Sequence, residues 1–333
     1  MIVTRTPFRI SFAGGGTDLP AFYSVEQGAV TSTAIDKYMY ITVNRRFDRT
    51  MRIGYSKTEI VEKVEQIAHP IVRESLKLCG IEGQIEITAV ADIPAGTGVG
   101  SSSSFTVGLL AALHAFKGEA VSPETLASEA CEIEINRLGE PIGKQDQYIA
   151  AYGGIEHIRF NPDESVVVEP VICSEAIRER LEEHLLLLFT GKRRNAGDLL
   201  RVQQERTPEV MDSLRRLRDL ASDTAEVLRR GEELAELGRI LHEGWDLKKR
   251  VNPSISDPQI DGFYDRALRA GAVGGKLLGA GGGGFLLLYC EGENRAKVRE
   301  ALCELQEAPF GLEPAGVKVV YTDERWMGWH IER

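Results

Sequence analysis

The sequence predicts an α+β protein of two domains. Its 333 residues are a length at which two compact domains are the usual arrangement. Short apolar runs typical of strands mix with helical patterns, without the regular strand–helix alternation of a doubly wound fold. After residues 161–163, Asn-Pro-Asp, charged helical patterns become more frequent. We therefore place a domain boundary near residue 165, giving predicted domains of residues 1–165 and 166–333.

The first half is predicted to hold strands and helices around glycine-rich loops. Ser122 is a typical N-cap and Pro123 suits the first turn of the helix that follows. The expected strands are residues 9–13, 38–45 and 84–90, and the expected helices are residues 105–116 and 123–137.

In the second half the patterns alternate between buried strands and one long charged region. Residues 185–190 and 285–289 are apolar runs of strand length, and residues 317–321 form a last expected strand. Leucines at helical spacing in residues 208–249 predict two or three helices, interrupted near Gly231.

Charge and cysteine content exclude several classes of protein. A net charge of −10 argues against a nucleic-acid or anionic-membrane binder, which needs a basic surface. The five cysteines are scattered and odd in number, which is typical of reduced thiols. No apolar run approaches the ~20 residues of a membrane helix, and the first residues lack a signal-peptide layout. We expect a cytoplasmic monomer or homodimer whose partner is a small molecule.

One glycine- and serine-rich segment, residues 94–104, directly precedes an expected helix. Its glycines let the backbone approach a phosphate, the helix N-terminus attracts anions, and its serine hydroxyls can donate to phosphate or bind Mg²⁺. A flexible turn with a serine cap is the plainer alternative. The segment is neither a Walker A motif nor a G-x-G-x-x-G motif.

Two further segments carry candidate chemistry. Glu134 lies on an expected helix and Asp146 follows twelve residues later, so one carboxylate could hold a metal while the other faces an acceptor hydroxyl. Glu132 and Glu140 are expected to be solvated. The glycine run of residues 279–284 fits a tight turn before a strand as well as it fits a binding loop.

Taken together, these segments resemble the three motifs of the GHMP kinases, a family of ATP-dependent small-molecule kinases. Residues 6–18 resemble the N-terminal motif, residues 94–104 the phosphate loop, and residues 276–285 the third motif. The resemblance implies an N-terminal α+β domain with a left-handed βαβ unit and a ferredoxin-like C-terminal domain, with the active site between them.

The resemblance also implies roles for individual residues. Ser102 and Glu134 would bind Mg²⁺, while Asp146 would face the acceptor hydroxyl as base or orienting anion, with Arg9 keeping it ionised. The phosphates of ATP would be wrapped by Gly96, Thr97, Gly98, Val99, Gly100, Ser101, Ser102, Ser103 and Ser104. The acceptor would lie against Gly15, Gly16, Thr17, Asp18, Gly281 and Gly282.

The expected acceptor is a sugar or a sugar phosphate. Galactokinases carry a Glu-His pair where this chain has Gly15-Gly16, which favours a longer acceptor. Residues 8–18, 143–148 and 245–249 resemble the D-glycero-D-manno-heptose 7-phosphate kinases, which phosphorylate the anomeric hydroxyl to give the 1,7-bisphosphate. A phosphorylated acceptor needs a cationic pocket, for which residues 192–194, with Arg193 and Arg194, or residues 248–250 are candidates.

Other functions remain open on the sequence alone. Within the kinases, the alternative is a fucokinase- or galactokinase-like enzyme acting on an unphosphorylated sugar. Outside them, the fold could serve a decarboxylase or a non-catalytic sugar sensor, although a sensor would not need Ser102, Glu134, Asp146 and Arg9 together. A dinucleotide-dependent oxidoreductase lacks its required motif order.

Overall fold

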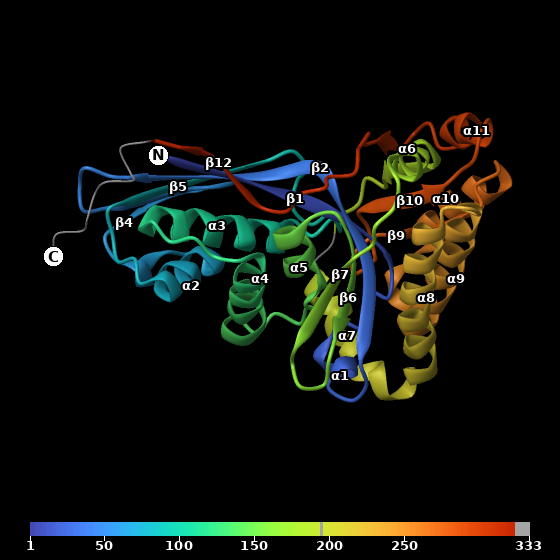
Figure 1. The fold of residues 1–333 in the computed structure, drawn as a ribbon, viewed down its shortest axis with the longest axis horizontal. Coiled ribbons are helices and arrows are strands. Elements are labelled where there is room, and N and C mark those ends of the chain that lie inside the picture. The colour runs from blue at the N-terminus through green and yellow to red at the C-terminus, as the bar shows by residue number, and fades with distance from the viewer. Residues whose placement is uncertain (194–195, 324–333) are drawn as a thin grey trace.

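Two β-sheets, each covered by helices, form the described part of the chain. The structure is a computed structural model that describes residues 1–193 and 196–323. The two sheets lie side by side along the long axis of the molecule, with α2–α5 packed beneath the first sheet in the view of Figure 1. Of the second-half helices, α6 and α8–α11 gather at the opposite end, while α7 lies near α1. The α+β prediction is confirmed.

The first sheet is built around a long antiparallel pair, β1 (Ile2–Ala13) and β2 (Gly28–Arg45). Both strands start before the expected residues 9–13 and 38–45, because buried Thr4 and Thr6 interrupt the apolar pattern and Pro7 lies at a shift in strand register. The other strands of this sheet are β3 (Met51–Gly54), β4 (Thr58–Val61), β5 (Ile85–Ala91), β6 (Ile155–Phe160), β7 (Val166–Pro170) and β12 (Lys318–Thr322).

Helix α3 (Ser101–Lys117) is the central helix of the first half, and apolar residues surround it on nearly all sides. Gly108 lets it approach β1 closely: a Cβ there would lie 2.4 Å from Thr6 Oγ1. The hydroxyl of Thr4 donates to the Gly108 carbonyl at 2.8 Å. This close packing fixes the N-terminus of α3 beside the end of β1. Around it lie α2 (Pro70–Cys79), α4 (Pro123–Cys131) and α5 (Gln145–Tyr152).

The helix predicted over residues 123–137 is confirmed, with one change of geometry. The Ser122 hydroxyl caps α4 by accepting from the Thr125 amide at 3.1 Å. After Cys131 the helix continues as a π-helical turn, η2 (Glu132–Arg137). Such turns are frequent at functional sites, and this one carries Glu134.

The second sheet has the topology of a ferredoxin-like domain. Its antiparallel order is β11 (Gln306–Glu307), β8 (Leu185–Phe189), β10 (Phe285–Tyr289) and β9 (Gly274–Leu277), which is strand order 4-1-3-2 along the chain. The expected strands 185–190 and 285–289 are confirmed as β8 and β10. The helices of this half are α6 (Glu175–His184), α7 (Ala196–Arg206), α8 (Met211–Arg230), α9 (Ala235–Val251), α10 (Pro258–Arg269) and α11 (Asn294–Ala301).

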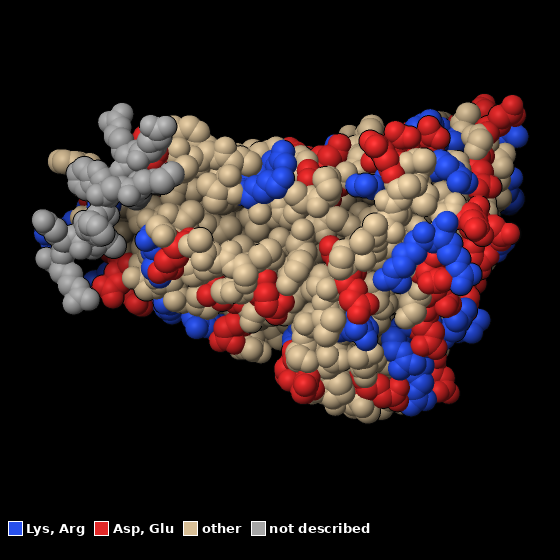
Figure 2. Space-filling model, in the orientation of Figure 1, with Lys and Arg blue, Asp and Glu red and all other residues tan. Residues whose placement is uncertain are grey.

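The long charged region forms two helices that end where the sequence predicts. Gly231 closes α8 in the left-handed conformation, with a φ of 68°. The face shown in Figure 2 carries charges of both signs, interspersed over the end of the molecule where α8 and α9 lie.

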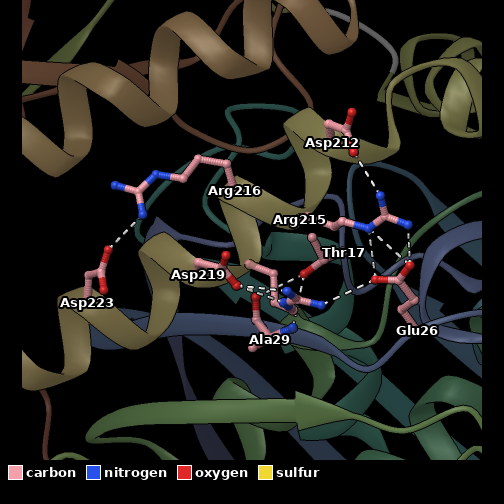
Figure 3. A network of polar contacts seen from close by, with 9 residues as sticks. Thr17, Glu26, Ala29, Asp212, Arg215, Arg216, Asp219 and Asp223 are labelled. Atoms are coloured by element: carbon pink, nitrogen blue, oxygen red, sulfur yellow. Dashed lines mark hydrogen bonds and ion pairs between the residues drawn. The ribbon is translucent and has the colours of Figure 1, made fainter.

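Helix α8 is tied to the first half of the chain by an ion-pair network. Arg215 reaches from α8 to Glu26, which follows the short helix α1 (Pro20–Tyr23), and its Nε lies 3.0 Å from Glu26 Oε1 (Figure 3). Beside this pair, the Thr17 hydroxyl donates to the Ala29 carbonyl at 2.9 Å. The network therefore holds the turn around residues 14–18 against the helices of the second half.

A division into domains at residue 165 stays a prediction. β7 follows that point and pairs with β6, and β12 returns to pair with β1 in the first sheet. None of the helices within residues 1–193 and 196–323 combines the length and apolar composition needed to cross a membrane.

Glu156 on β6 makes the stability of the fold depend on pH. It is buried, its Oε2 has no hydrogen-bond partner among the described residues, and burial raises its pKa to about 7. Because this value exceeds that of an exposed glutamate, the unfolded chain releases its proton first as pH rises. The free energy of unfolding should therefore fall between about pH 4.5 and pH 7 and then level off.

Replacing Glu156 with glutamine should remove this loss. Glu156→Gln is expected to leave stability near pH 4.5 unchanged and to raise the free energy of unfolding at pH 8 by up to about 3 kcal/mol. Urea unfolding at a series of pH values measures the effect, with Glu179→Gln on the exposed face of α6 as the control. Parallel stability curves for the wild type and Glu156→Gln would contradict the assignment.

Candidate active site

A cleft of about 310 Å³ is lined by residues from both halves of the chain. The first half contributes the end of β1, the glycine turn after it, the loop before α3, η2 and the start of α5. The second half contributes residues of α7 and α9 and the third glycine segment. Among the lining residues are Arg9, Gly16, Asp18, Gly96, Gly98, Gly100, Ser101, Ser102, Ser103, Glu134, Asp146, Lys248, Gly279 and Ala280.

The loop before α3 takes a conformation that depends on its glycines. Gly96, Gly98 and Gly100 all have positive φ, and Gly100 is the N-cap of α3 without a side-chain cap. The helix N-terminus is thus left open toward the cleft, where its amides and dipole can bind an anion. Val99 and Thr97 are buried and point away, and the Val99 carbonyl accepts from the Arg9 amide at 3.1 Å.

The third glycine segment, residues 279–284, and Leu278 before it pack directly against the loop before α3. A Cβ on Gly98 would lie 2.6 Å from the Leu278 carbonyl, and a Cβ on Gly284 would lie 2.3 Å from the Thr97 carbonyl. The Phe285 amide donates to the same Thr97 carbonyl at 3.2 Å. Backbone packs directly on backbone at this point, so both segments need glycine.

Ser102 and Glu134 meet at the start of α3. The Ser102 hydroxyl donates to Glu134 Oε1 at 2.7 Å, and the Gln147 side chain donates to Glu134 Oε2 at 2.7 Å. Burial raises the pKa of the Glu134 carboxyl despite these hydrogen bonds. Within residues 1–193 and 196–323, neither of its hydrogen-bond donors is a cation, and a divalent cation beside the carboxylate would supply a positive partner.

The donor set at this point suits Mg²⁺. Within the described residues no group of three or more His, Cys, Asp or Glu side chains could hold a metal on its own. Mg²⁺ is usually bound through one or two protein oxygens together with water and substrate phosphates. Ser102 and Glu134 fit that pattern, provided that a phosphate occupies the N-terminus of α3.

Arg9 and Asp146 form a two-pronged ion pair in the floor of the cleft. Arg9 Nε lies 2.7 Å from Asp146 Oδ1, and Arg9 Nη2 lies 2.8 Å from Oδ2. Arg9 is buried and its third contact is the Gly98 carbonyl, while the Asp146 carboxylate stays partly exposed in the first turn of α5. The pair therefore holds a carboxylate in a fixed orientation next to the loop before α3.

Asp18 is a second buried carboxylate that lines the cleft, and its two hydrogen-bond donors are neutral. The Gly16 amide donates to Asp18 Oδ1 at 2.8 Å, and the Gln145 side chain donates to Oδ2 at 2.9 Å. Burial raises the pKa of Asp18. Gly143 packs against this carboxylate so closely that a Cβ would lie 2.0 Å from Oδ2.

Lys248 also lines the cleft, although the sequence indicates it only as one of three neighbouring basic residues. It lies on α9, is buried, and lines the cleft between Gly15 and Gly279. Burial lowers its pKa, and the neighbouring Asp18 carboxylate opposes that shift. Its neighbours Lys249 and Arg250 do not line the cleft. Of the basic cluster predicted at residues 248–250, therefore, only Lys248 is among the described residues that line it.

Several other predicted residues lie beside the cleft. The Thr17 hydroxyl donates to the Gly14 and Ala29 carbonyls. The Gly282 amide donates to the Ile255 carbonyl. Gly15 faces Lys248 and Gln145, and Gly281 packs on Ile255. Gly279 and Ala280 of the third segment line the cleft, but Gly281 and Gly282 are not among its lining residues.

The candidate basic cluster of residues 192–194 is described only in part. Lys192 forms an ion pair with Asp257, and Arg193 is exposed and is not among the residues that line the cleft. Arg194 lies outside the described residues. Glu132 is partly exposed and pairs with Arg137, as expected, while the exposed Glu140 stands at the rim of the cleft.

Comparison with known proteins agrees with this geometry. Residues 60–154 match the model of the GHMP kinases N terminal domain and residues 224–308 that of the GHMP kinases C terminal domain, together more than half of the chain. A D-glycero-alpha-D-manno-heptose 7-phosphate kinase of Campylobacter jejuni is 28% identical, across 95% of this chain and 98% of that protein. A bifunctional fucokinase/GDP-fucose pyrophosphorylase of Arabidopsis thaliana is also 28% identical, across 90% of this chain and 31% of that protein.

A solved structure has the same fold over almost the full length. The crystal structure of a D-glycero-D-manno-heptose 1-phosphate kinase from Bacteroides thetaiotaomicron superposes with a TM-score of 0.81 and 25% identity, covering 97% of this chain and 100% of that chain. The matched family models, this fold and the cleft with its three glycine segments lead to one conclusion: the chain belongs to the GHMP kinase family and is a phosphotransferase.

Proposed function

We propose that the protein transfers the terminal phosphoryl group of ATP, with Mg²⁺, to the anomeric hydroxyl of D-glycero-D-manno-heptose 7-phosphate, giving the 1,7-bisphosphate. One observation carries the phosphoryl-transfer part of this proposal. Gly100, the N-cap of α3, contacts both members of the Arg9–Asp146 pair: a Cβ there would lie 3.1 Å from Arg9 Cγ and 3.3 Å from Asp146 Oδ2. The N-terminus of α3, which can bind an anion, and the Asp146 carboxylate thus lie next to each other at Gly100.

The donor side of the reaction rests on the loop before α3. Its amides and the N-terminus of α3 would hold the phosphates of ATP, with Ser102 and Glu134 oriented toward the metal. Mg²⁺, when bound, neutralises charge on the phosphate oxygens and orients the terminal phosphoryl group. Arg9, paired with Asp146, would add a fixed positive charge close to the transferred phosphoryl group.

The acceptor side rests on Asp146 and Asp18. Asp146 accepts the hydrogen bond of the acceptor hydroxyl and receives its proton as the oxygen attacks phosphorus, and ADP leaves. Arg9 holds the Asp146 carboxylate in one orientation through two hydrogen bonds. Asp18, held by the Gly16 amide and Gln145, is available to orient further hydroxyls of the sugar.

The choice of acceptor rests on resemblance together with the open glycine turn. The relative that aligns with nearly all of both chains is a heptose 7-phosphate kinase, and a heptose phosphate kinase shares the fold. Gly15 lacks the side chain that galactokinases carry at this turn, and the groups nearest to a Cβ there, on Gln145 and Lys248, lie 3.7 and 3.8 Å away. The missing side chain favours a larger sugar. The alternative is an unphosphorylated sugar, as the similarity to a fucokinase suggests.

The proposal is tested by ADP release with a panel of hexoses, heptoses and their phosphates. The heptose 7-phosphate should be turned over with the highest kcat/KM, NMR should locate the new phosphate at the anomeric position, and EDTA should abolish the activity. Faster turnover of fucose or galactose would favour the alternative acceptor. Absence of ADP release with every sugar would overturn the proposal.

Asp146→Asn tests the role of the paired carboxylate. The amide cannot take a proton, so kcat should fall by on the order of 10²–10⁴-fold. ATP contacts the loop before α3 instead, so its Kd, measured by titration calorimetry, should stay near that of the wild type. Near-normal turnover of the variant would refute the assignment of Asp146.

Gly143→Ala tests whether Asp18 contacts the acceptor. The new methyl group would displace the Asp18 carboxylate, so the KM of the sugar should rise by on the order of tenfold while the KM of ATP changes little. Gly262→Ala is the matched control, because that glycine in α10 has open space around it. Equal changes in both KM values would show that the substitution disturbs the whole cleft.

A further inference from the structure

Lys248 is a buried cation that lacks the partners a buried cation normally has. Its only hydrogen bond is to the Gly279 carbonyl, at 3.4 Å, and no ion pair joins it to a carboxylate in the part of the chain that the structure describes. Removing an ammonium group from water without compensation is costly. Since Lys248 lines the cleft, an anionic ligand could supply the missing partner there.

Gln203 on α7 carries a second unpaired donor, next to the Gly16 turn that lines the cleft. The residue is 1% exposed, and its Nε2 has no hydrogen-bond partner among the described residues. This nitrogen lies against Gly16, where a Cβ would approach it to 2.3 Å. Gln203 is not itself among the lining residues, but Leu200 and Gly197, one and two helical turns earlier, are, so Gln203 continues the helix face that borders the cleft.

The turn between the two donors has no side chains to fill the space. A Cβ on Gly15 would lie 3.8 Å from Lys248 Nζ and 3.9 Å from Ser11 Oγ, a buried hydroxyl that also has no hydrogen-bond partner in the described ranges. An ammonium, an amide and a hydroxyl, all buried and incompletely hydrogen-bonded, therefore surround Gly15 and Gly16.

A neighbouring lysine shows what a structural cation looks like in this fold. Lys276 on β9 is equally buried, but it donates to the Ser11 and Phe12 carbonyls at 2.8 and 3.2 Å and does not line the cleft. Its contacts tie the second sheet to the end of β1. Burial lowers the pKa of both lysines, and the charge of Lys248 adds to the fall at Lys276. The Asp18 carboxylate opposes this fall in both lysines, and Asp146 opposes it in Lys248.

We propose that Lys248 and Gln203 form a subsite for the phosphate monoester of the acceptor, around the Gly15-Gly16 turn. The inference rests on the proposed kinase function and names the residues that select a phosphorylated sugar. A dianionic phosphate offers several acceptor oxygens, enough to pair with the ammonium and the amide at once.

The other basic groups considered from the sequence are engaged elsewhere or lie away from the cleft. Arg193 and Arg250 are exposed and are not among the residues that line it, and Arg194 lies outside the described residues. Lys192 pairs with Asp257, and Lys249 lies 3.2 Å from Asp246 and over the Trp245 ring. Arg9 is committed to Asp146 and to the Gly98 carbonyl. Of the described residues that line the cleft, Lys248 is thus the cation left to meet an acceptor phosphate.

The test compares two acceptors that differ only in the phosphate. KM is measured for D-glycero-D-manno-heptose 7-phosphate and for D-glycero-D-manno-heptose, with the wild type, Lys248→Met, Gln203→Leu and the control Lys249→Met. The ratio of KM for heptose over KM for heptose 7-phosphate should fall by roughly 10- to 100-fold in Lys248→Met and by about tenfold in Gln203→Leu. Lys249→Met should keep the wild-type ratio.

A binding measurement without ATP separates this inference from the proposed function. Without ATP neither sugar is turned over, so titration calorimetry measures the Kd of heptose 7-phosphate and that of heptose directly. The ratio of the two Kd values reports the preference for the phosphorylated sugar. Loss of the preference in Lys248→Met supports the subsite even if no ADP is released.

Two outcomes would overturn the subsite. One is a fall in kcat for both acceptors with an unchanged KM ratio in Lys248→Met, which would assign Lys248 to the transferred phosphoryl group. The other is loss of the preference in Arg193→Ala together with its retention in Lys248→Met and Gln203→Leu. If Lys248→Met does not fold, Gln203→Leu, which keeps the buried volume and removes no charge, is the deciding variant. An unchanged KM ratio in Gln203→Leu would then contradict the subsite.

Discussion

The contact of backbone on backbone between the loop before α3 and the third glycine segment is the constraint on which the site depends. Gly98 lies against Leu278 and Gly279, and Gly284 lies against Thr97, at distances that leave no room for a Cβ on either side. Arg9 joins the same junction by donating to the Gly98 carbonyl. Two segments more than 170 residues apart are thus held as one surface, and the open N-terminus of α3 is part of it.

Buried charge in the cleft is arranged so that only one pair is complete. Arg9 and Asp146 form two hydrogen bonds with one another, which fixes the carboxylate beside the loop before α3. Glu134, Asp18 and Lys248 have mostly neutral neighbours, and burial shifts the pKa of each group toward its uncharged form. Such unpaired buried charges cost stability and are characteristic of sites that bind charged ligands. In this cleft the incomplete groups lie at the two ends, with the completed pair between them.

Much of this arrangement is visible in the sequence because it is local. The apolar run 285–289, the break at Gly231 and the Ser122 cap each depend on neighbouring residues, and each was predicted correctly. Lys248 was less distinct because its burial depends on how α9 packs against β9, a contact made possible by Gly238 and Gly274. The pairing of Gly143 with Asp18 and the unpaired amide of Gln203 likewise arise from chain segments far apart in sequence. The contribution of α7 to the cleft could not be read from its charged, weakly patterned sequence.

The two ends of the cleft also differ in which part of the chain builds them. The phosphate loop, Glu134 and Asp146 belong to the first half, where α3 packs tightly on β1 through Gly108. In the proposed function, α7 and α9 complete the acceptor end of the cleft. The Asn252–Leu199 hydrogen bond joins α7 to the end of α9, and α9 packs against α8, which Arg215 ties to Glu26 in the first half. A substitution on α7 or α9 can therefore alter which acceptor is bound while the groups around the transferred phosphoryl keep their positions. This division provides a physical route by which one kinase framework can accept different sugars.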